Sequence, residues 1–230
     1  MEHLLEESAF FGVLISIIGY QTGLFLRKKF KLAIFNPLLV SILLIIAVLL
    51  VFHVDYDSYN SSAKFLSYLL TPATICLAAP LYEQLELLKK NYRAILIGII
   101  SGVLSSLGSI FIFSLLFHFS HAEYATLLPK SITTAIGMGV SEELGGIVTI
   151  TVTVIIITGV LGNMMAERVC RLFRIKDPIA RGIAIGTAAH AIGTAKAMEM
   201  GEIEGAMSSL AIAVAGLITV VGASIFANFI

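Results

Sequence analysis

The sequence repeats the stretch Pro129-Lys130-Ser131-Ile132-Thr133-Thr134-Ala135 as Ala189-His190-Ala191-Ile192-Gly193-Thr194-Ala195, 60 residues later. Extended without a gap over 129–162 and 189–222, the alignment holds nine identities in 34 positions. Internal similarity at a fixed offset is typical of a structural repeat. The repeat places Lys130 opposite His190, so two ionisable residues occupy equivalent points of two apolar segments.

The composition is typical of a protein embedded in a lipid bilayer. Of 230 residues, 58% are hydrophobic and only 13% are charged, and the mean hydropathy is +0.97. Apolar runs long enough to cross a hydrocarbon layer of about 30 Å recur along the whole sequence. We therefore expect an all-α polytopic membrane protein with no soluble domain.

The apolar runs predict about six full transmembrane helices. Four form a membrane region over 1–125, and one belongs to each of the two repeats, 126–166 and 178–230. The expected spans are 8–26, 32–53, 64–88, 92–117, 145–166 and 205–228. Pro72 and Pro80 should kink or break the third span. The fourth span carries rows of Gly and Ser at four-residue spacing, which suit helix packing or a pore lining.

Three basic clusters predict the orientation of these spans. They lie at 27–31, 89–93 and 168–181, each beside an apolar run, and the net charge of the chain is zero. Basic residues collect on the cytoplasmic side, so we interpret the clusters as topology signals and not as nucleic-acid binding. Both chain ends should then lie outside a bacterial cell (inner) membrane. The acidic start of the chain lacks the basic residues of a signal peptide.

The same charge placement predicts that the two repeats are inverted. The fourth span ends outside, and only one full crossing fits between it and the third basic cluster, which lies inside. We therefore expect 127–142 to enter the membrane from outside and to return to the same side. By the same reasoning, 178–204, centred on 180–200, should enter from the cytoplasmic side. Both segments are expected as re-entrant hairpins or broken helices, an arrangement typical of secondary transporters.

The interrupted segments concentrate groups that suit a small carboxylate. Lysine and histidine supply positive charge, hydroxyls donate hydrogen bonds, and glycine permits free backbone amides. The candidate substrate-binding residues are Lys130, Ser131, Thr133, Thr134, His190, Gly193 and Thr194. Two alternatives stay open: Lys130 as an interfacial lysine that snorkels to the surface, and His190 as a hydrogen-bonded packing residue.

Three further charged residues are candidates for coupling transport to protons. Glu142 and Glu202 match across the repeat, and Lys196 lies in the second segment. The glutamates equally suit the ends of the two segments at opposite membrane faces, and Lys196 suits the cytoplasmic surface. No hydrolase elbow, phosphate-binding loop or metal cluster is visible, so we expect neither an enzyme nor a cofactor or metal.

At these segments the chain resembles the LrgB/CidB family of bacterial membrane proteins. The stretches that carry the resemblance are 128–134, Ser141 to Gly146, 175–182, 186–195 and 199–202, with 72–74 and 79–82 upstream. The resemblance implies an antiholin-like or holin-like role in which a smaller LrgA/CidA-type partner takes part and murein hydrolase activity, lysis and cell death are modulated. It equally implies carriage of small organic acids, because relatives are linked to pyruvate in bacteria and to glycolate and glycerate in plastids.

From the residues, carriage is the expected main function. Inverted interrupted repeats have a physical purpose in a carrier, whereas a holin needs only to oligomerise. We expect a secondary transporter of small monocarboxylates, with proton coupling as an option, and the antiholin-like or holin-like regulator as the alternative. The expected partners are the lipid bilayer, a small organic anion, an LrgA/CidA-type protein and further copies of the chain.

Overall fold

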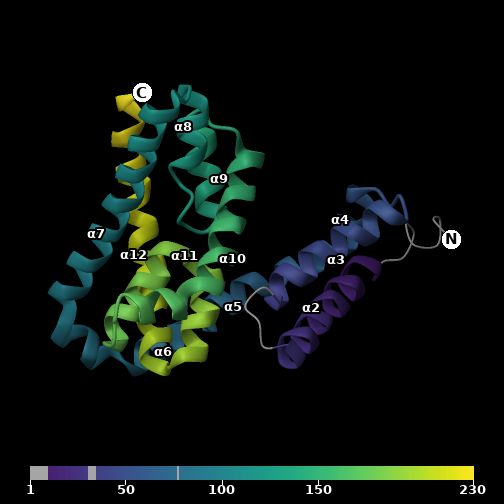
Figure 1. Ribbon diagram of the computed structural model, residues 1–230, viewed down its shortest axis with the longest axis horizontal. Coiled ribbons are helices and arrows are strands. Elements are labelled where there is room, and N and C mark those ends of the chain that lie inside the picture. Colours follow the sequence, from purple (N-terminus) through teal and green to yellow (C-terminus); the bar gives the residue numbers. More distant parts are fainter. Residues whose placement is uncertain (1–9, 31–34, 77) are drawn as a thin grey trace. The chain divides into compact units, whose positions relative to one another are not determined.

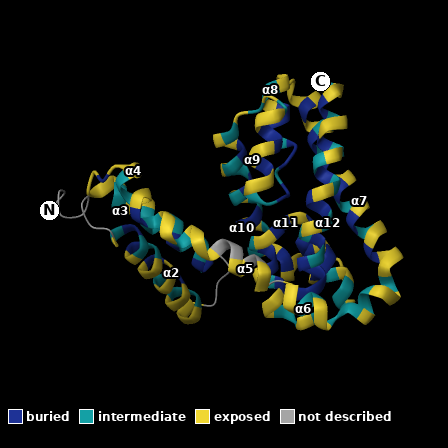
Figure 2. Cartoon of the chain, turned by 180° about the vertical axis from the view of Figure 1, so that it is seen from behind, coloured by how far each residue is buried: buried dark blue, intermediate teal, exposed yellow. Residues whose placement is uncertain are grey.

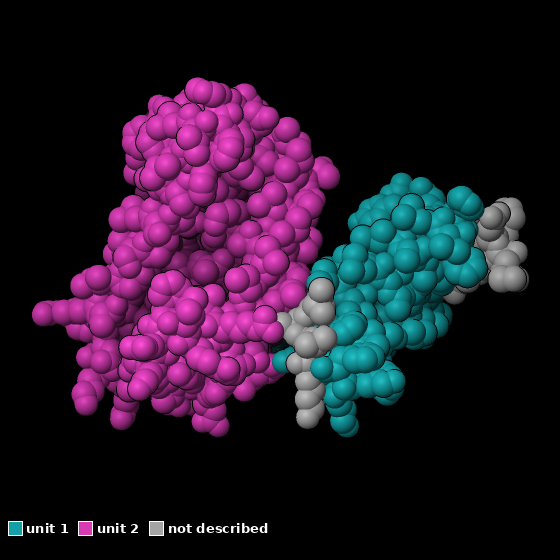
Figure 3. All heavy atoms as spheres, in the orientation of Figure 1, with its two compact units in different colours: residues 1–76 teal, residues 77–230 magenta. Residues whose placement is uncertain are grey.

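The computed structural model describes residues 10–30, 35–76 and 78–230, and every regular element in these ranges is helical (Figure 1). The chain divides into two compact units, Met1–Cys76 and Leu77–Ile230, which Figure 3 colours separately. The acidic N-terminal residues and Lys31 of the first basic cluster lie outside the described residues. The expected division after residue 125 stays a prediction.

Unit 1 is built on a pair of antiparallel helices. Its elements are α2 (Phe11–Phe30), α3 (Pro37–Val51), α4 (Tyr56–Ala63), η2 (Lys64–Leu69) and α5 (Leu70–Cys76). Glycines bring α2 and α3 together: a Cβ atom on Gly19 would lie 2.9 Å from Ser41 Oγ, and one on Gly23 would lie 2.6 Å from Pro37 Cα. Such close approach is how helices associate where lipid replaces water. Asn36 caps the start of α3.

Unit 2 holds both members of the repeat. Its elements are α6 (Ala78–Glu83), α7 (Leu85–Phe117), α8 (His121–Leu127), α9 (Thr134–Glu143), α10 (Val148–Leu172), α11 (Pro178–Met200), α12 (Glu202–Phe226) and η3 (Ala227–Phe229). Figure 1 shows α8 and α9 towards one end of α7, and α11 with α6 towards the other.

The segment expected as a third span, 64–88, is divided into η2, α5 and α6. Pro72 and Pro80 each lie in the first turn of a short helix, α5 and α6. A proline there loses no hydrogen bond, because the first N–H groups of a helix have no partner. The prolines therefore begin new helices instead of bending one long span.

The fourth expected span begins earlier than the predicted boundary. It was expected over 92–117, whereas α7 starts at Leu85 and has 33 residues. At 1.5 Å per residue such a helix is about 50 Å long, which exceeds the ~30 Å hydrocarbon layer. Its first turns, with Lys89 and Arg93, extend the helix beyond the apolar part.

Within the described residues, three helices are long and apolar enough to cross a bilayer: α7, α10 and α12 with η3. The all-α fold and the membrane class are confirmed. The expected number of six full spans is not. The shortfall lies in unit 1 and the segment after it. There α3 has only 15 residues, the last turn of α2 holds three basic residues, and the third segment is divided into short helices.

The first repeat begins with a helical hairpin made of α8 and α9. Thr151 of α10 reaches both arms, because its Oγ1 lies within hydrogen-bond distance of Thr126 O, at 2.9 Å, and of Ser141 Oγ, at 2.7 Å. One turn further along α10, Ile155 lies against Gly137. The arm α9 therefore runs back along α10, and the hairpin turns between α8 and α9.

This hairpin is longer than the expected segment 127–142, because α8 begins at His121. Ser120 and Glu123 form a capping box there: Ser120 N donates to the Glu123 carboxylate at 2.8 Å, and Glu123 N donates to Ser120 Oγ at 3.4 Å. At the other end Gly145, with φ of +76°, follows Leu144, the C-cap residue of α9. A left-handed glycine is a common way to end a helix.

The second repeat begins with α11, which doubles back at His190. The backbone there has φ 41° and ψ −141°, values that no helix contains. The contacts of α11 with α12 show the reversal: Gly182 packs on Glu204, Gly186 on Ser208, Thr194 on Ser208 and Met198 on Gly205. Before the break α11 runs parallel to α12 and after it antiparallel, so 178–200 is a helical hairpin whose tip is His190.

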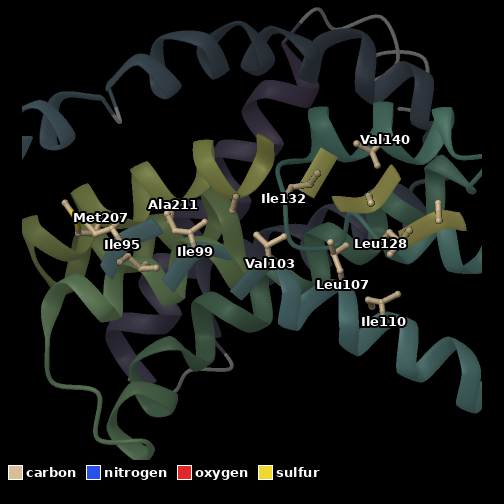
Figure 4. Packing of buried hydrophobic residues seen from close by; sticks show 14 of the residues in the cluster. Ile95, Ile99, Val103, Leu107, Ile110, Leu128, Ile132, Val140, Met207 and Ala211 are labelled. Atoms are coloured by element: carbon tan, nitrogen blue, oxygen red, sulfur yellow. The ribbon is translucent and has the colours of Figure 1, made fainter. Parts of the chain in front are cut away.

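The core of unit 2 lies between α7, α12 and the two hairpins. One face of α7 is buried at spacings of three and four residues, through Ile95, Ile99, Val103, Leu107 and Ile110 (Figure 4). This is the spacing of one helix face. Much of the remaining surface of α7 is exposed, as Figure 2 shows, and it includes large apolar side chains such as Ile97 and Ile112. Such a surface suits contact with lipid.

Candidate functional site

The two hairpins point their tips at each other along α7. At the middle of α7, a Cβ atom on Gly102 would lie 2.7 Å from Thr187, which precedes the second tip. One turn later Ser106 Oγ lies 3.1 Å from Ser131 Oγ, at the first tip. Further on, the Phe111 ring packs against Tyr124 in the arm α8. Along its length α7 thus contacts first the second hairpin, as far as its tip, and then the first hairpin, beginning at its tip.

The helices that follow the two hairpins run in opposite directions. α10 passes the second tip, where a Cβ atom on Gly159 would lie 2.7 Å from the His190 ring, and reaches Lys196 near the hairpin's end through Glu167. α12 starts beside Arg181, at the same end, and runs towards the tip. The repeated sequence therefore folds into two hairpin–helix pairs of opposite direction.

A cavity of about 960 Å³ lies between α7, the first arm of α11 and the first hairpin tip. We call it the tip cavity. Its polar lining comes from Asn91, Ser101, Ser105, Ser106, Ser109, Lys130, Ser131, Asp177 and Thr187, and the rest is mainly Gly, Ala and Ile. The Gly and Ser rows of α7 therefore line a cavity as well as a helix contact.

Lys130 is the cationic residue of this lining. It is half-buried, and its Nζ donates to Ser131 Oγ at 3.0 Å. Ser131 in turn lies 3.1 Å from Ser106 Oγ. An ammonium group with two hydroxyls beside it offers several donors to one small anion.

Thr187 contributes a buried hydroxyl group to the lining of the tip cavity. Its side chain is only 6% exposed, and Oγ1 has no hydrogen-bond partner among the described residues. A buried hydroxyl without a partner costs free energy, so it is found where a ligand or water satisfies it. Thr187 is not among the site residues expected from the sequence, because spacing alone does not separate it from its neighbours.

His190 lies outside the lining of the tip cavity. Its imidazole is 3% exposed, and Nε2 lies 3.1 Å from Ile155 O of α10. Thr194 Oγ1 donates to His190 O at 3.0 Å and lies 2.7 Å from Ser208 Oγ. Gly193 packs against the first arm of its own hairpin. These three expected site residues hold the hairpin turn together, and the structure does not bring His190 and Lys130 into one cavity wall.

The other expected residues lie along the hairpins without lining the tip cavity. Thr133 occupies the N-cap position of α9 without a side-chain capping bond, and Thr134 is the first residue of the helix; both are half-buried. Glu142 and Glu202 are exposed, at the end of α9 and the start of α12. Lys196 Nζ lies 3.4 Å from a Glu167 oxygen and 3.3 Å from a Glu199 oxygen.

The broken backbone of the second hairpin has a hydrogen-bonding partner on α10. Asn163 Nδ2 donates to Ile192 O at 2.7 Å, within three residues of the break. Replacing Asn163 with Leu should lower the free energy of unfolding by about 1 kcal/mol, because a carbonyl at the break loses its donor. That corresponds to a fall in Tm of roughly 2–4 °C.

A thiol-reactive fluorophore measures this effect, because Cys170 is buried and becomes reactive on unfolding. Exposed Cys76 is first replaced by Ser. The matched control is Thr153→Val, which removes only a bond to Thr149 O within the same helix. An unchanged Tm for Asn163→Leu would show that the break needs no support from α10.

Comparison with known proteins assigns the family. The LrgB-like family model matches residues 16–229. Antiholin-like protein LrgB of Bacillus cereus strain B4264 is 40% identical over 222 residues, 96% of this chain and 96% of the relative. The protein of the same name from Bacillus anthracis strain CDC 684 / NRRL 3495 gives the same identity and coverage. No solved structure matches. With a family model across nearly its whole length, this chain belongs to the LrgB family of membrane proteins.

Proposed function

We propose that this protein is an antiholin-like membrane protein, which restrains membrane permeabilisation and thereby murein hydrolase activity and lysis. The observation that carries the proposal is the 40% identity with proteins named antiholin-like LrgB over 96% of both chains. From the residues alone, carriage of a small acid was the expected main function and the antiholin-like role was the alternative. The matched relatives reverse that order.

The surface of the structure supports a function carried out within the bilayer. Large apolar side chains are exposed along α7, α10 and α12, with Ile97, Ile112 and Leu217 all more than 60% exposed. These faces suit lipid, further copies of the chain or a smaller LrgA/CidA-type membrane protein. The proposed partners are therefore further copies of this chain and an LrgA/CidA-type protein. We place the protein in a bacterial cell membrane with both chain ends outside.

The proposal is tested by deleting the gene in its host and measuring detergent-induced autolysis and extracellular murein hydrolase activity. We expect faster lysis and higher hydrolase activity in the deletion strain, and restoration by a plasmid copy. Complementation with and without the gene of the LrgA/CidA-type partner shows whether the two act together. Unchanged lysis and hydrolase activity in the deletion strain would contradict the proposal.

A second candidate function is carriage of a small monocarboxylate, of the pyruvate or glycolate class. It is favoured by the opposed hairpin tips and by the tip cavity between them, which holds Lys130 and the unpartnered hydroxyl of Thr187. Paired interrupted segments of opposite direction are the arrangement in which secondary transporters bind substrate. In this proposal Lys130 is the counter-charge of the carboxylate, and Ser131 and Thr187 donate hydrogen bonds.

Purified protein in liposomes separates this second function from the first. Saturable uptake of labelled pyruvate, glycolate or lactate supports a carrier, and dependence of uptake on a pH gradient supports proton coupling. The absence of uptake for all three acids, with and without the partner, would remove the carrier and leave the antiholin-like proposal intact.

A further inference from the structure

A second cavity, separate from the tip cavity, lies where α10 ends and the second hairpin begins. Its volume is about 490 Å³. We call it the basic pocket. It is lined by Glu167, Cys170, Arg171, Arg174, Ile175, Lys176, Arg181, Lys196, Glu199 and Met200. Five cationic and two anionic side chains therefore surround one hollow. From the sequence, the third basic cluster was interpreted as a signal for membrane topology. In the folded chain, four of its residues also line a pocket.

Three of the five cations of the basic pocket are held by carboxylates. Arg171 pairs with Glu167 at 3.1 Å, and Lys196 lies between Glu167 and Glu199. Arg181 lies 3.5 Å from Glu204 Oε1, and its Nε donates to a backbone carbonyl at 2.8 Å. These pairs fix the walls of the pocket, and they neutralise much of their own charge.

Arg174 and Lys176 are the two cations that remain for a ligand. Both are exposed, and neither side chain has an ion-pair or hydrogen-bond partner within the part of the chain that the structure describes. Two charges directed at one pocket attract a phosphate, which accepts several hydrogen bonds at once.

The backbone of Arg174 supports a binding role. It follows the C-cap of α10 with φ of 55°, in the left-handed region. Ile175 N donates to Cys170 O at 2.8 Å and Arg174 N to Arg171 O at 3.2 Å, the pattern of a helix end that glycine normally occupies. A side chain in this conformation is strained, and retained strain points to function.

The position of the basic pocket identifies the source of the phosphate. It lies at the end of α10, an apolar helix able to cross a bilayer, where lipid headgroups are found. Leu172 and Phe173, beside Arg174, are 76% and 70% exposed and suit insertion among acyl chains. We propose that the basic pocket binds a phosphate-bearing anion, supplied by the headgroup of an anionic membrane lipid. This goes beyond the proposed function and does not depend on it.

The test uses the purified full-length protein and native mass spectrometry after delipidation. Phosphatidylglycerol is added in one arm, zwitterionic phosphatidylcholine in a second, and inorganic phosphate competes in a third. We expect phosphatidylglycerol to bind preferentially, and the variant Arg174→Gly/Lys176→Gln to bind it roughly 10- to 30-fold more weakly. Displacement by millimolar phosphate, without a preference for phosphatidylglycerol, would assign the pocket to a soluble phosphate compound.

The chain offers controls for this variant. Arg174→Gly alone should keep or raise Tm, because glycine accepts a positive φ without strain, so weaker lipid binding cannot come from unfolding. Arg168→Gln removes an exposed charge on α10, six residues before Arg174 and outside the basic pocket, and should leave binding unchanged. Equal binding of both lipids without phosphate competition would overturn the proposal, as would equal losses in the Arg168 and Arg174/Lys176 variants.

Discussion

Replacing Gly186 with Ile should unfold or severely destabilise the protein. A Cβ atom on Gly186 would lie 2.8 Å from Ala211 Cβ and 2.9 Å from Ser208 Cα, and it would press on the Ser208 carbonyl oxygen. Backbone cannot move aside as a flexible side chain can, so α11 and α12 must separate. We expect a loss of about 3 kcal/mol or more in the free energy of unfolding. That corresponds to a fall in Tm of roughly 6–12 °C.

Size-exclusion chromatography and thermal unfolding in detergent measure this effect. The control is Gly108→Ala on α7, where an added Cβ would meet nothing within 4 Å, so its Tm should not fall. A Gly186→Ile protein with the Tm of the parent would show that α11 and α12 are not packed as closely as the structure places them.

Replacing Lys130 with Gln should raise the KM for carboxylate uptake roughly 10- to 100-fold in liposomes. Lys130 is the cationic side chain of the tip cavity, and a hydrogen bond between charged groups contributes about 1.5–3 kcal/mol. Tm should change little, because Nζ is bonded to the neighbouring Ser131 and holds no helices together. This prediction rests on the carrier function.

Two further variants sharpen the Lys130 experiment. Thr187→Val should also weaken uptake, yet it should keep or raise Tm, since a buried hydroxyl without a partner is replaced by a methyl group. Lys89→Gln, at the start of α7 and outside the tip cavity, should leave KM unchanged. Equal uptake by the Lys130 and Lys89 variants would remove Lys130 from the substrate site.

Comparing a His190 variant with the Lys130 variant separates an effect on packing from an effect on substrate binding. In the structure it supports the hairpin turn through Ile155 O and is not part of the tip cavity. His190→Ala should therefore lower Tm together with uptake, whereas Lys130→Gln should lower uptake alone. From the sequence, Lys130 and His190 were expected to have equivalent roles, because both are ionisable residues at matching positions of a repeat.

Much of the fold of unit 2 was predictable from local sequence. Apolar runs predicted α10 and α12, and charge placement predicted that segments before them double back. The prolines predicted a break in 64–88, but not that they would begin new helices. The six full crossings stay a prediction, because an apolar run shows that a segment suits lipid and does not show that it forms one long helix.

The sequence by itself determined the membrane class and the LrgB resemblance, and it predicted two interrupted repeats, because hydropathy and charge are local properties. Only the tertiary structure decided which polar groups meet. Lys130 and Thr187 line one cavity because α7 brings the two hairpin tips together, while His190 faces α10. Likewise, the orientation rule explains why Arg174 and Lys176 are basic, but only the folded chain shows that they border a pocket. Side-chain direction at a broken helix depends on packing between distant segments, which no spacing along the chain records.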